Sequence, residues 1–122
     1  MERMTEAEIR VMEVLWKGGE LPAGQIARTL QAEVGWNRNT TYTLLGRCID
    51  KEAVTRRDPG FLCRALISRE SVQKEEAEAL AQRLFDGSQE LLFASMLGGR
   101  KLTREEAARL HALIDDAGDE MP

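Results

Sequence analysis

Apolar side chains recur at the spacing of a single helix face in the first part of the chain. Thr5 and Glu8 have the spacing of a capping box before the first such run, and Gly18-Gly19 ends it. Pro22 suits the start of a second run, which Gly35 closes. The apolar residues are Ile9, Val11, Met12, Leu15 and Trp16 in the first run and Ile26, Ala27 and Leu30 in the second. We therefore predict two amphipathic helices that serve as a scaffold.

A third helical run follows Trp36, and its two faces differ in chemistry. Asn37 suits the position that caps the first turn. The face that we predict to be buried carries Thr41, Leu44, Leu45, Cys48 and Ile49, whereas the opposite face carries Asn39, Tyr42, Thr43, Gly46 and Arg47, with Thr40 at the border. Short hydrogen-bonding groups, a methyl group and a cation suit base edges and phosphates, whereas a solvated helix face is usually rich in Glu and Lys. The composition therefore favours a reading helix, with an ordinary solvated face as the alternative.

Two strand-like runs follow, at residues 54–57 and 61–66, and Asp58-Pro59-Gly60 joins them. Pro presets one turn torsion and Gly accepts a positive one, so the chain can reverse within this tripeptide. Three helices followed by a hairpin with Arg56 and Arg57 beside its turn is the layout of a winged helix-turn-helix, in which wing cations reach phosphates. The hairpin pattern alone does not exclude the alternative, an ordinary surface hairpin whose arginines have no DNA partner. We expect a mainly α, winged-helix DNA-binding domain over residues 1–67.

From residue 68 the pattern becomes helical only, and we expect a separate helical region over residues 68–122. Ser68 and a capping box at Thr103 begin helices, and Gly87 and Gly98-Gly99 end them. Short amphipathic helices cannot bury all their own apolar surface, so we predict that a second copy of the chain covers it in a homodimer. The alternative is that this region folds back on its own winged helix. The side chains that we assign to the dimer contact are Leu80, Leu84, Leu91, Leu92, Met96, Leu110, Leu113 and Ile114.

The net charge of −4 at first argues against a nucleic-acid partner, because the phosphate backbone favours Lys and Arg. The distribution of charge changes this picture. Residues 34–64 carry a net charge of +3, from six basic and three acidic side chains, and residues 68–122 carry −5, from seven basic and twelve acidic ones. We predict phosphate contacts from Asn37, Arg38, Arg47, Lys51, Arg56 and Arg57, and base contacts from Asn39, Thr40, Tyr42 and Thr43.

Other chemistry finds little support in the sequence. Cys48 and Cys63 belong to no metal or redox motif, and we interpret both as small buried apolar residues. His111, the only histidine, has no nucleophile or carboxylate at a supporting spacing, and no Gly-rich phosphate motif occurs. We therefore expect a protein that is not an enzyme and that uses no metal or cofactor. The lack of a secretory signal and of a long apolar run favours a cytoplasmic location.

The order of these segments resembles the penicillinase and methicillin-resistance repressors (BlaI/MecI). The resemblance runs from about Thr5 to Asp115 and includes TEAEIRVMEVLWK, GQIARTL, WNRNTTYTLLGRCIDKEAV, DPGF and LTREEAARLHALID. Its strongest part is the pattern W-x(3)-T-x(2)-T-x-L-x-R, which runs from Trp36 to Arg47. The resemblance implies a dimeric winged-helix repressor that binds operators of dyad symmetry and dimerises through residues 68–117. By the same resemblance, the recognition helix contains Asn39, Thr40, Tyr42 and Thr43.

Three departures limit what the resemblance implies. In the resistance repressors a membrane-sensor pathway leads to cleavage at an Asn-Phe bond, and the matching positions here are Ser95 and Met96. That cleavage is therefore not carried over, although an adjacent gene for a membrane sensor-protease would restore it. The related copper-responsive repressors have C-terminal Cys-x-Cys pairs, which this chain lacks, so thiolate copper sensing is excluded. Arg38 replaces the usual Pro after the helix cap and adds a cation there.

Two functions remain open. The first is a sequence-specific, DNA-binding transcriptional repressor, and the second is a winged-helix module that has lost DNA binding and docks another protein, which the acidity would permit. The salt dependence of DNA affinity separates them, because phosphate contacts release counterions.

Overall fold

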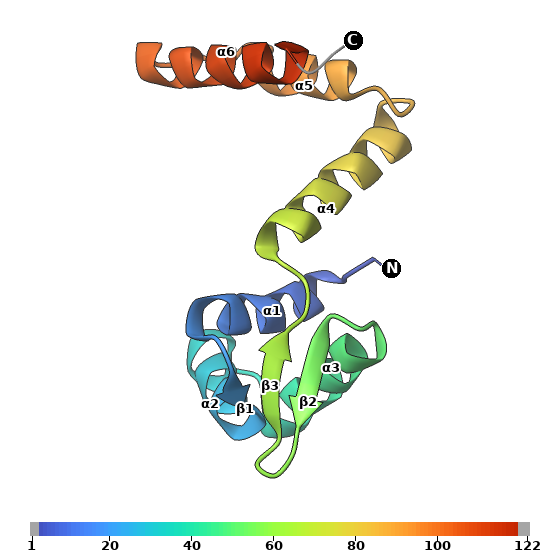
Figure 1. Cartoon of the computed structure of the whole chain (residues 1–122), viewed down its shortest axis with the longest axis vertical. Coiled ribbons are helices and arrows are strands. Elements are labelled where there is room, and N and C mark those ends of the chain that lie inside the picture. The colour runs from blue at the N-terminus through green and yellow to red at the C-terminus, as the bar shows by residue number, and fades with distance from the viewer. Residues whose placement is uncertain (1–2, 120–122) are drawn as a thin grey trace. The chain divides into compact units, whose positions relative to one another are not determined.

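The computed structural model of the chain describes the backbone of residues 3–119 and the side chains of residues 3–118. The chain forms two compact units, Met1–Ala79 and Leu80–Pro122. The first unit contains three helices followed by a β-hairpin, and the second is helical (Figure 1). The mainly helical composition that the sequence predicts is confirmed.

Three helices form the scaffold of the first unit: α1 (Glu6–Gly18), α2 (Ala23–Val34) and α3 (Arg38–Asp50). The predicted capping box is present at the start of α1. The Thr5 hydroxyl accepts a hydrogen bond from the Glu8 amide at 3.2 Å, and the Glu8 carboxylate accepts one from the Thr5 amide at 2.7 Å. Gly35 closes α2 with a φ of 76°, which glycine adopts without strain. Both predicted scaffold helices are thus confirmed.

A three-stranded antiparallel sheet completes the first unit, in the order β1 (Leu21–Pro22), β3 (Leu62–Ala65), β2 (Val54–Arg57). Strands β2 and β3 form the predicted hairpin, with Gly60 in its turn at a φ of 96°. The sequence does not predict β1, because this strand has only two residues and Pro22 has no amide hydrogen to donate. Pro22 therefore pairs with Leu62 and stands just before α2 instead of forming its first turn.

The core of the first unit lies where the three helices meet the sheet. Its fully buried side chains include Met12 and Leu15 from α1, Leu30 from α2, Leu45 from α3 and Val54 from β2. Burial of such apolar surface stabilises a fold by about 25 cal/mol per Å². Because α3 packs on both α1 and α2 through its apolar face, its polar face is left to solvent.

Three further helices follow the sheet: α4 (Arg69–Leu84), α5 (Gln89–Leu97) and α6 (Arg104–Asp119). The Ser68 hydroxyl accepts a hydrogen bond from the Ser71 amide at 3.0 Å, as expected for a cap. Thr103 and Glu106 form the predicted capping box at the start of α6. Among residues 3–119, none of the helices has the length and apolar character that crossing a membrane requires.

The first turns of α4 belong to the first compact unit. Arg3 donates a hydrogen bond to the Glu76 carboxylate at 2.7 Å, and the indole N–H of Trp16 donates one to the Ile67 carbonyl at 2.9 Å. The guanidinium of Arg69 lies 5.1 Å from the centre of the Trp16 ring. The compact unit thus extends past the end of the winged helix, and the functional division at residues 67 and 68 stays a prediction.

Candidate nucleic-acid interface

Helix α3 is positioned by its cap and by its apolar face. The Asn37 side chain accepts a hydrogen bond from the Thr40 amide at 2.8 Å, so the predicted cap is confirmed. The predicted buried face is also confirmed, because burial is complete or nearly so at Thr41, Leu44, Leu45 and Cys48, and partial at Ile49. The exposed side chains of the opposite face are Asn39, Thr40, Thr43 and Arg47.

Three of these exposed side chains carry groups that can read base edges. The Asn39 amide both donates and accepts hydrogen bonds, which is what adenine requires in the major groove. The hydroxyls of Thr40 and Thr43 can do either, and their methyl groups can pack against the methyl of thymine. No carboxylate precedes Asp50 on this helix, so nothing on α3 itself repels phosphates from its first three turns.

Tyr42 is only half-exposed, although it shares the polar face of α3. Its ring contacts the ring of Phe61, which follows the hairpin turn, with ring centres 5.6 Å apart and ring planes at 78°. Its hydroxyl accepts a hydrogen bond from the Arg38 guanidinium at 2.9 Å. Tyr42 therefore joins α3 to the wing, and its predicted contact with bases stays a prediction.

The two wing arginines are paired with carboxylates within the chain. Arg56 lies 3.2 Å from the Asp58 carboxylate, and Arg57 lies 2.7 Å from the Glu20 carboxylate. Both arginines are exposed, and exposed ion pairs add little to the stability of a protein. Exchange of these carboxylates for DNA phosphates is therefore inexpensive, and both arginines stay in the predicted phosphate contacts.

Lys51 is paired within the protein instead, which argues against its predicted role as a phosphate contact. Its ammonium donates hydrogen bonds to the Glu8 carboxylate at 2.7 Å and to the Arg3 carbonyl at 2.8 Å, and 14% of its side chain is exposed. The Glu8 side chain is 1% exposed, so removing Lys51 would leave a buried charge at a cost of about 3 kcal/mol or more. Burial alone would raise the pKa of the Glu8 carboxyl, but hydrogen bonds from Lys51 and Thr5 outweigh it and lower the pKa.

Arg28 on α2 is a candidate that the sequence reasoning missed. A β-carbon at Gly24, in the first turn of α2, would lie 3.7 Å from the Arg28 guanidinium and 3.8 Å from the Tyr42 hydroxyl. Arg28 is exposed and forms no ion pair within the described part of the chain. No local pattern in the sequence indicates this placement, because it depends on the packing of α2 beside α3.

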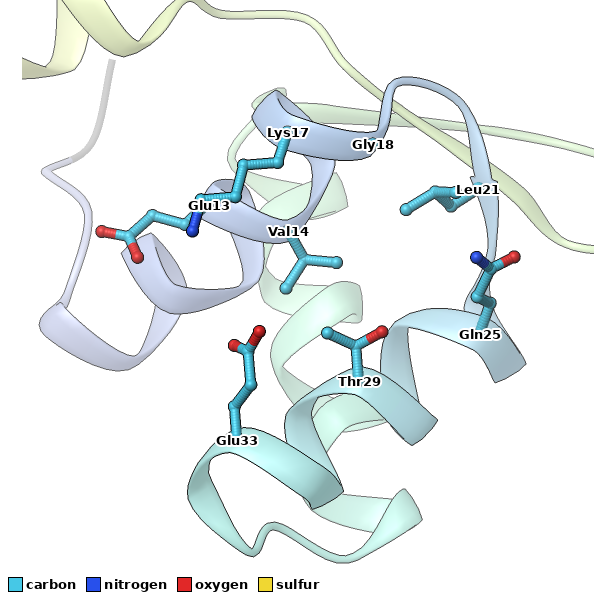
Figure 2. A pocket seen from close by; sticks show the side chains of 8 residues that line it. All are labelled: Glu13, Val14, Lys17, Gly18, Leu21, Gln25, Thr29 and Glu33. Atoms are coloured by element: carbon cyan, nitrogen blue, oxygen red, sulfur yellow. The ribbon is translucent and has the colours of Figure 1, made fainter.

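A shallow cavity of about 240 Å³ lies between α1 and α2 (Figure 2). Helix α1 contributes Glu13 and Lys17 to its lining, and α2 contributes Thr29 and Glu33. Its lining residues come neither from α3 nor from the hairpin turn. The cavity therefore lies outside the candidate interface.

Both cysteines are buried free thiols, as the sequence predicts. Burial, followed by the nearby Glu8 carboxylate, raises the pKa of the Cys48 thiol to about 12, and burial raises the pKa of Cys63 as well. Neither thiol is therefore a ready nucleophile, because the thiolate is the reactive form. Within residues 3–118, no three His, Cys, Asp or Glu side chains gather closely enough to hold a metal ion.

The sequence model of a family described as the penicillinase repressor matches residues 4–116. This chain belongs to the penicillinase repressor family. A penicillinase repressor from Bacillus licheniformis is 22% identical over 116 residues, which cover 93% of this chain and 91% of that protein. The solution structure of the DNA binding domain of the repressor BlaI is 28% identical and has a TM-score of 0.51, covering 54% of this chain and 83% of that domain.

The family match spans both compact units. The similarity of this penicillinase repressor family member to its family is therefore not limited to the winged helix. The resemblance given by the sequence motifs is confirmed. The structural match is to a domain of the same family and confirms the winged-helix fold. The chain is thus classed among transcriptional repressors.

Proposed function

We propose that this repressor is a homodimer that binds DNA sequence-specifically, at an operator of dyad symmetry. The observation that carries the proposal is the exposed face of α3, where Asn39, Thr40 and Thr43 stand together without a carboxylate. In a winged helix-turn-helix this helix enters the major groove. Family membership and the likeness to the DNA binding domain of BlaI support the assignment.

The cations around this face are proposed to bind phosphates. Arg38 and Arg47 are exposed near the two ends of α3, and Arg28 lies beside its first turns on α2. Arg56 and Arg57 would exchange their exposed carboxylate partners for the DNA backbone. Phosphate contacts of this kind position the protein, while base contacts select the sequence.

The second unit is proposed to form the dimer. Eight of the nine exposed large apolar side chains in the described chain lie there: Leu84, Leu91, Phe93, Met96, Leu97, Leu110, Leu113 and Ile114. Each is 37–67% exposed, and a stable interface needs about 800 Å² of surface from each partner. Of the residues assigned to the dimer contact from the sequence, Leu92 is buried within the chain and Leu80 is half-buried, so these two support the helices from inside.

A two-fold dimer would place two α3 helices on half-sites about one helical turn of DNA apart, roughly 34 Å. We also propose that the protein acts in the cytoplasm, where such an operator is accessible. Ser95 and Met96 are exposed within α5. Replacement of the Asn-Phe pair argues for release of the repressor by another signal, and a neighbouring gene for a membrane sensor-protease would argue for cleavage.

Selection of duplexes from a random library by the full-length chain tests DNA recognition. We expect one palindromic sequence to be enriched and to bind about 1,000-fold more tightly than random duplex. Arg47→Ala should reduce the slope of log affinity against log salt by about one per protomer, whereas Lys74→Ala, an exposed lysine on α4, should not change it. A library from which no sequence is enriched, even at low salt, would contradict the proposal and favour a protein-docking module.

Analytical ultracentrifugation tests the dimer. Leu113 and Ala112 are both exposed on α6, but Ala112 lies away from the stripe formed by Leu110, Leu113 and Ile114. We expect Leu113→Asp to sediment as a monomer at micromolar concentration, because it places a charge in the apolar contact. Ala112→Asp should remain a dimer. A wild-type chain that sediments as a monomer at micromolar concentration would refute the proposed dimer.

A further inference from the structure

Four side chains from α3 and the wing form one continuous stack. The Arg38 guanidinium lies 5.0 Å from the centre of the Tyr42 ring and also donates to its hydroxyl. The Tyr42 ring meets the Phe61 ring in an edge-to-face contact. The Arg56 guanidinium lies 3.6 Å from the centre of the Phe61 ring. We call Arg38, Tyr42, Phe61 and Arg56 the helix-wing stack.

The backbone at Phe61 is an independent sign that this arrangement is held in place. Phe61 has a φ of 49°, in the left-handed region that bulky residues rarely adopt. Its carbonyl accepts a hydrogen bond from the amide of Ala23, the first residue of α2, at 2.9 Å. Strained residues of this kind persist where their surroundings fix them, and they cluster at ligand clamps and functional sites. Phe61 thus ties the hairpin turn to α2 as well as to α3.

The stack has a cation at each end, one on the reading helix and one on the wing. A guanidinium over an aromatic ring is held at its face, while its N–H groups stay in plane and can still meet a phosphate. Arg56 is exposed on β2 and its ion pair with Asp58 is exposed too, so without the rings its guanidinium would have to be ordered when DNA binds. Fixing a group in its bound position before binding increases affinity by removing that ordering cost.

We propose that the helix-wing stack sets the position of the wing relative to α3, which presents Arg38 and Arg56 to the DNA backbone as a preset pair. This inference rests on the proposed DNA-binding function. Tyr42 and Phe61 are then positioning residues, which act on DNA through the two arginines. Tyr42 thereby takes a different role from the base contact that the sequence predicts.

A double-substitution cycle on the selected duplex tests the stack. Arg56→Ala should weaken binding by about fivefold or more in the wild-type background and reduce the salt slope by about one per protomer. In a Tyr42→Leu background, where the wing is no longer held, Arg56→Ala should change affinity by less than about twofold. Arg57→Ala is the matched control, because Arg57 neighbours Arg56 on β2 but pairs with Glu20 outside the stack. Its effect should be the same in both backgrounds.

Two further variants keep the test decisive. Tyr42→Phe retains the ring and should retain the coupling to Arg56. If Tyr42→Leu fails to fold in a thermal melt, Phe61→Leu takes its place in the cycle, with the same expectation. If Arg56→Ala weakens DNA binding equally in all backgrounds, the stack proposal is wrong. It is also wrong if Tyr42→Phe changes the preferred DNA sequence while the effects of the Tyr42 and Arg56 substitutions on affinity simply add, because Tyr42 would then read bases. If the wild-type chain selects no duplex, the proposed function fails and the stack proposal fails with it.

Discussion

Thr41 offers a direct test of how α3 is packed, because it is a polar side chain in an otherwise apolar face. It is 0% exposed, and its hydroxyl oxygen has no hydrogen-bond partner within the described part of the chain. Substitution by valine replaces that hydroxyl with a methyl group and keeps the branched shape. Both residues are β-branched, so their helix propensities are similar.

The expected gain in stability follows from the burial. A buried hydroxyl that lacks a partner costs about 1–3 kcal/mol relative to a satisfied one. Thr41→Val should therefore raise the free energy of unfolding by about 1–2 kcal/mol. For a unit of this size, such a gain corresponds to a rise in melting temperature of roughly 5–10 °C.

Urea titration followed by tryptophan fluorescence measures this gain. Trp16 and Trp36 both belong to the first compact unit, so the signal reports the unit that contains Thr41. The midpoint should rise while the slope of the transition stays constant. Thr43→Val is the matched control on the exposed face of the same helix, and it should change stability by less than about 0.5 kcal/mol. The affinity for DNA should show the opposite pattern: Thr41→Val should leave it unchanged, and Thr43→Val should lower it.

A Thr41→Val variant with an unchanged or lower midpoint would refute this reasoning. It would mean that the hydroxyl is satisfied after all, for example by the Asn37 carbonyl one turn earlier in α3. A loss of DNA binding in Thr41→Val, with stability intact, would instead show that the face assigned to the core contributes to recognition.

Three further predictions concern charge, backbone and thiol chemistry. Glu8→Gln should lower the free energy of unfolding at pH 7 by about 3 kcal/mol. Because the pKa of Glu8 is lowered by folding, its contribution is present above the unfolded-state pKa and is lost as pH falls through the folded-state pKa. Urea titrations should therefore show the gap between wild type and variant closing as the pH falls through the folded-state pKa of Glu8, and a gap that does not change with pH would contradict the ion pair. Glu52→Gly should stabilise the chain by about 1 kcal/mol, because Glu52 has a φ of 61°, which glycine adopts without strain. Glu75→Gly within α4 is the control and should destabilise the chain by a similar amount. If both variants lower the melting temperature, the backbone at Glu52 is not strained. Iodoacetamide at pH 8 should modify Cys48 and Cys63 only after urea is added, as measured by the mass of the protein. Rapid labelling of either thiol in the native protein would contradict this prediction.

The parts of the fold that the sequence predicts are those decided by neighbouring residues. The capping boxes at Thr5 and Thr103 depend on side chains three positions apart, and the two faces of α3 depend on helical periodicity. These features are local, so the pattern alone is sufficient. Strand β1 depends instead on pairing between Leu21 and Cys63, which no local pattern indicates.

The difference between local and long-range interactions also explains which candidate site residues are exposed as predicted and which are not. Asn39 and Thr43 are exposed because of their place on the α3 wheel. Lys51, the residue that caps the end of α3, looks available as a cation in the sequence, but its partner Glu8 comes from a helix 43 residues earlier. Tyr42 likewise meets Phe61 from beyond the hairpin turn. Local pattern assigns a side chain to a face, and tertiary packing decides whether its polar group is free.

Packing also explains how a chain of net charge −4 can present a basic reading face. Of the cations predicted to bind phosphates, Lys51 stabilises the fold through a buried carboxylate, and its charge is already balanced. Arg38 and Arg47 have no carboxylate partner within the described residues, and those of Arg56 and Arg57 are exposed and weakly held. The cations that we propose to bind phosphates are those not held by a buried carboxylate, so the net charge of the chain does not decide the charge of this face. The side chain that holds α3 in place and the side chains proposed to contact DNA are therefore different members of one basic segment.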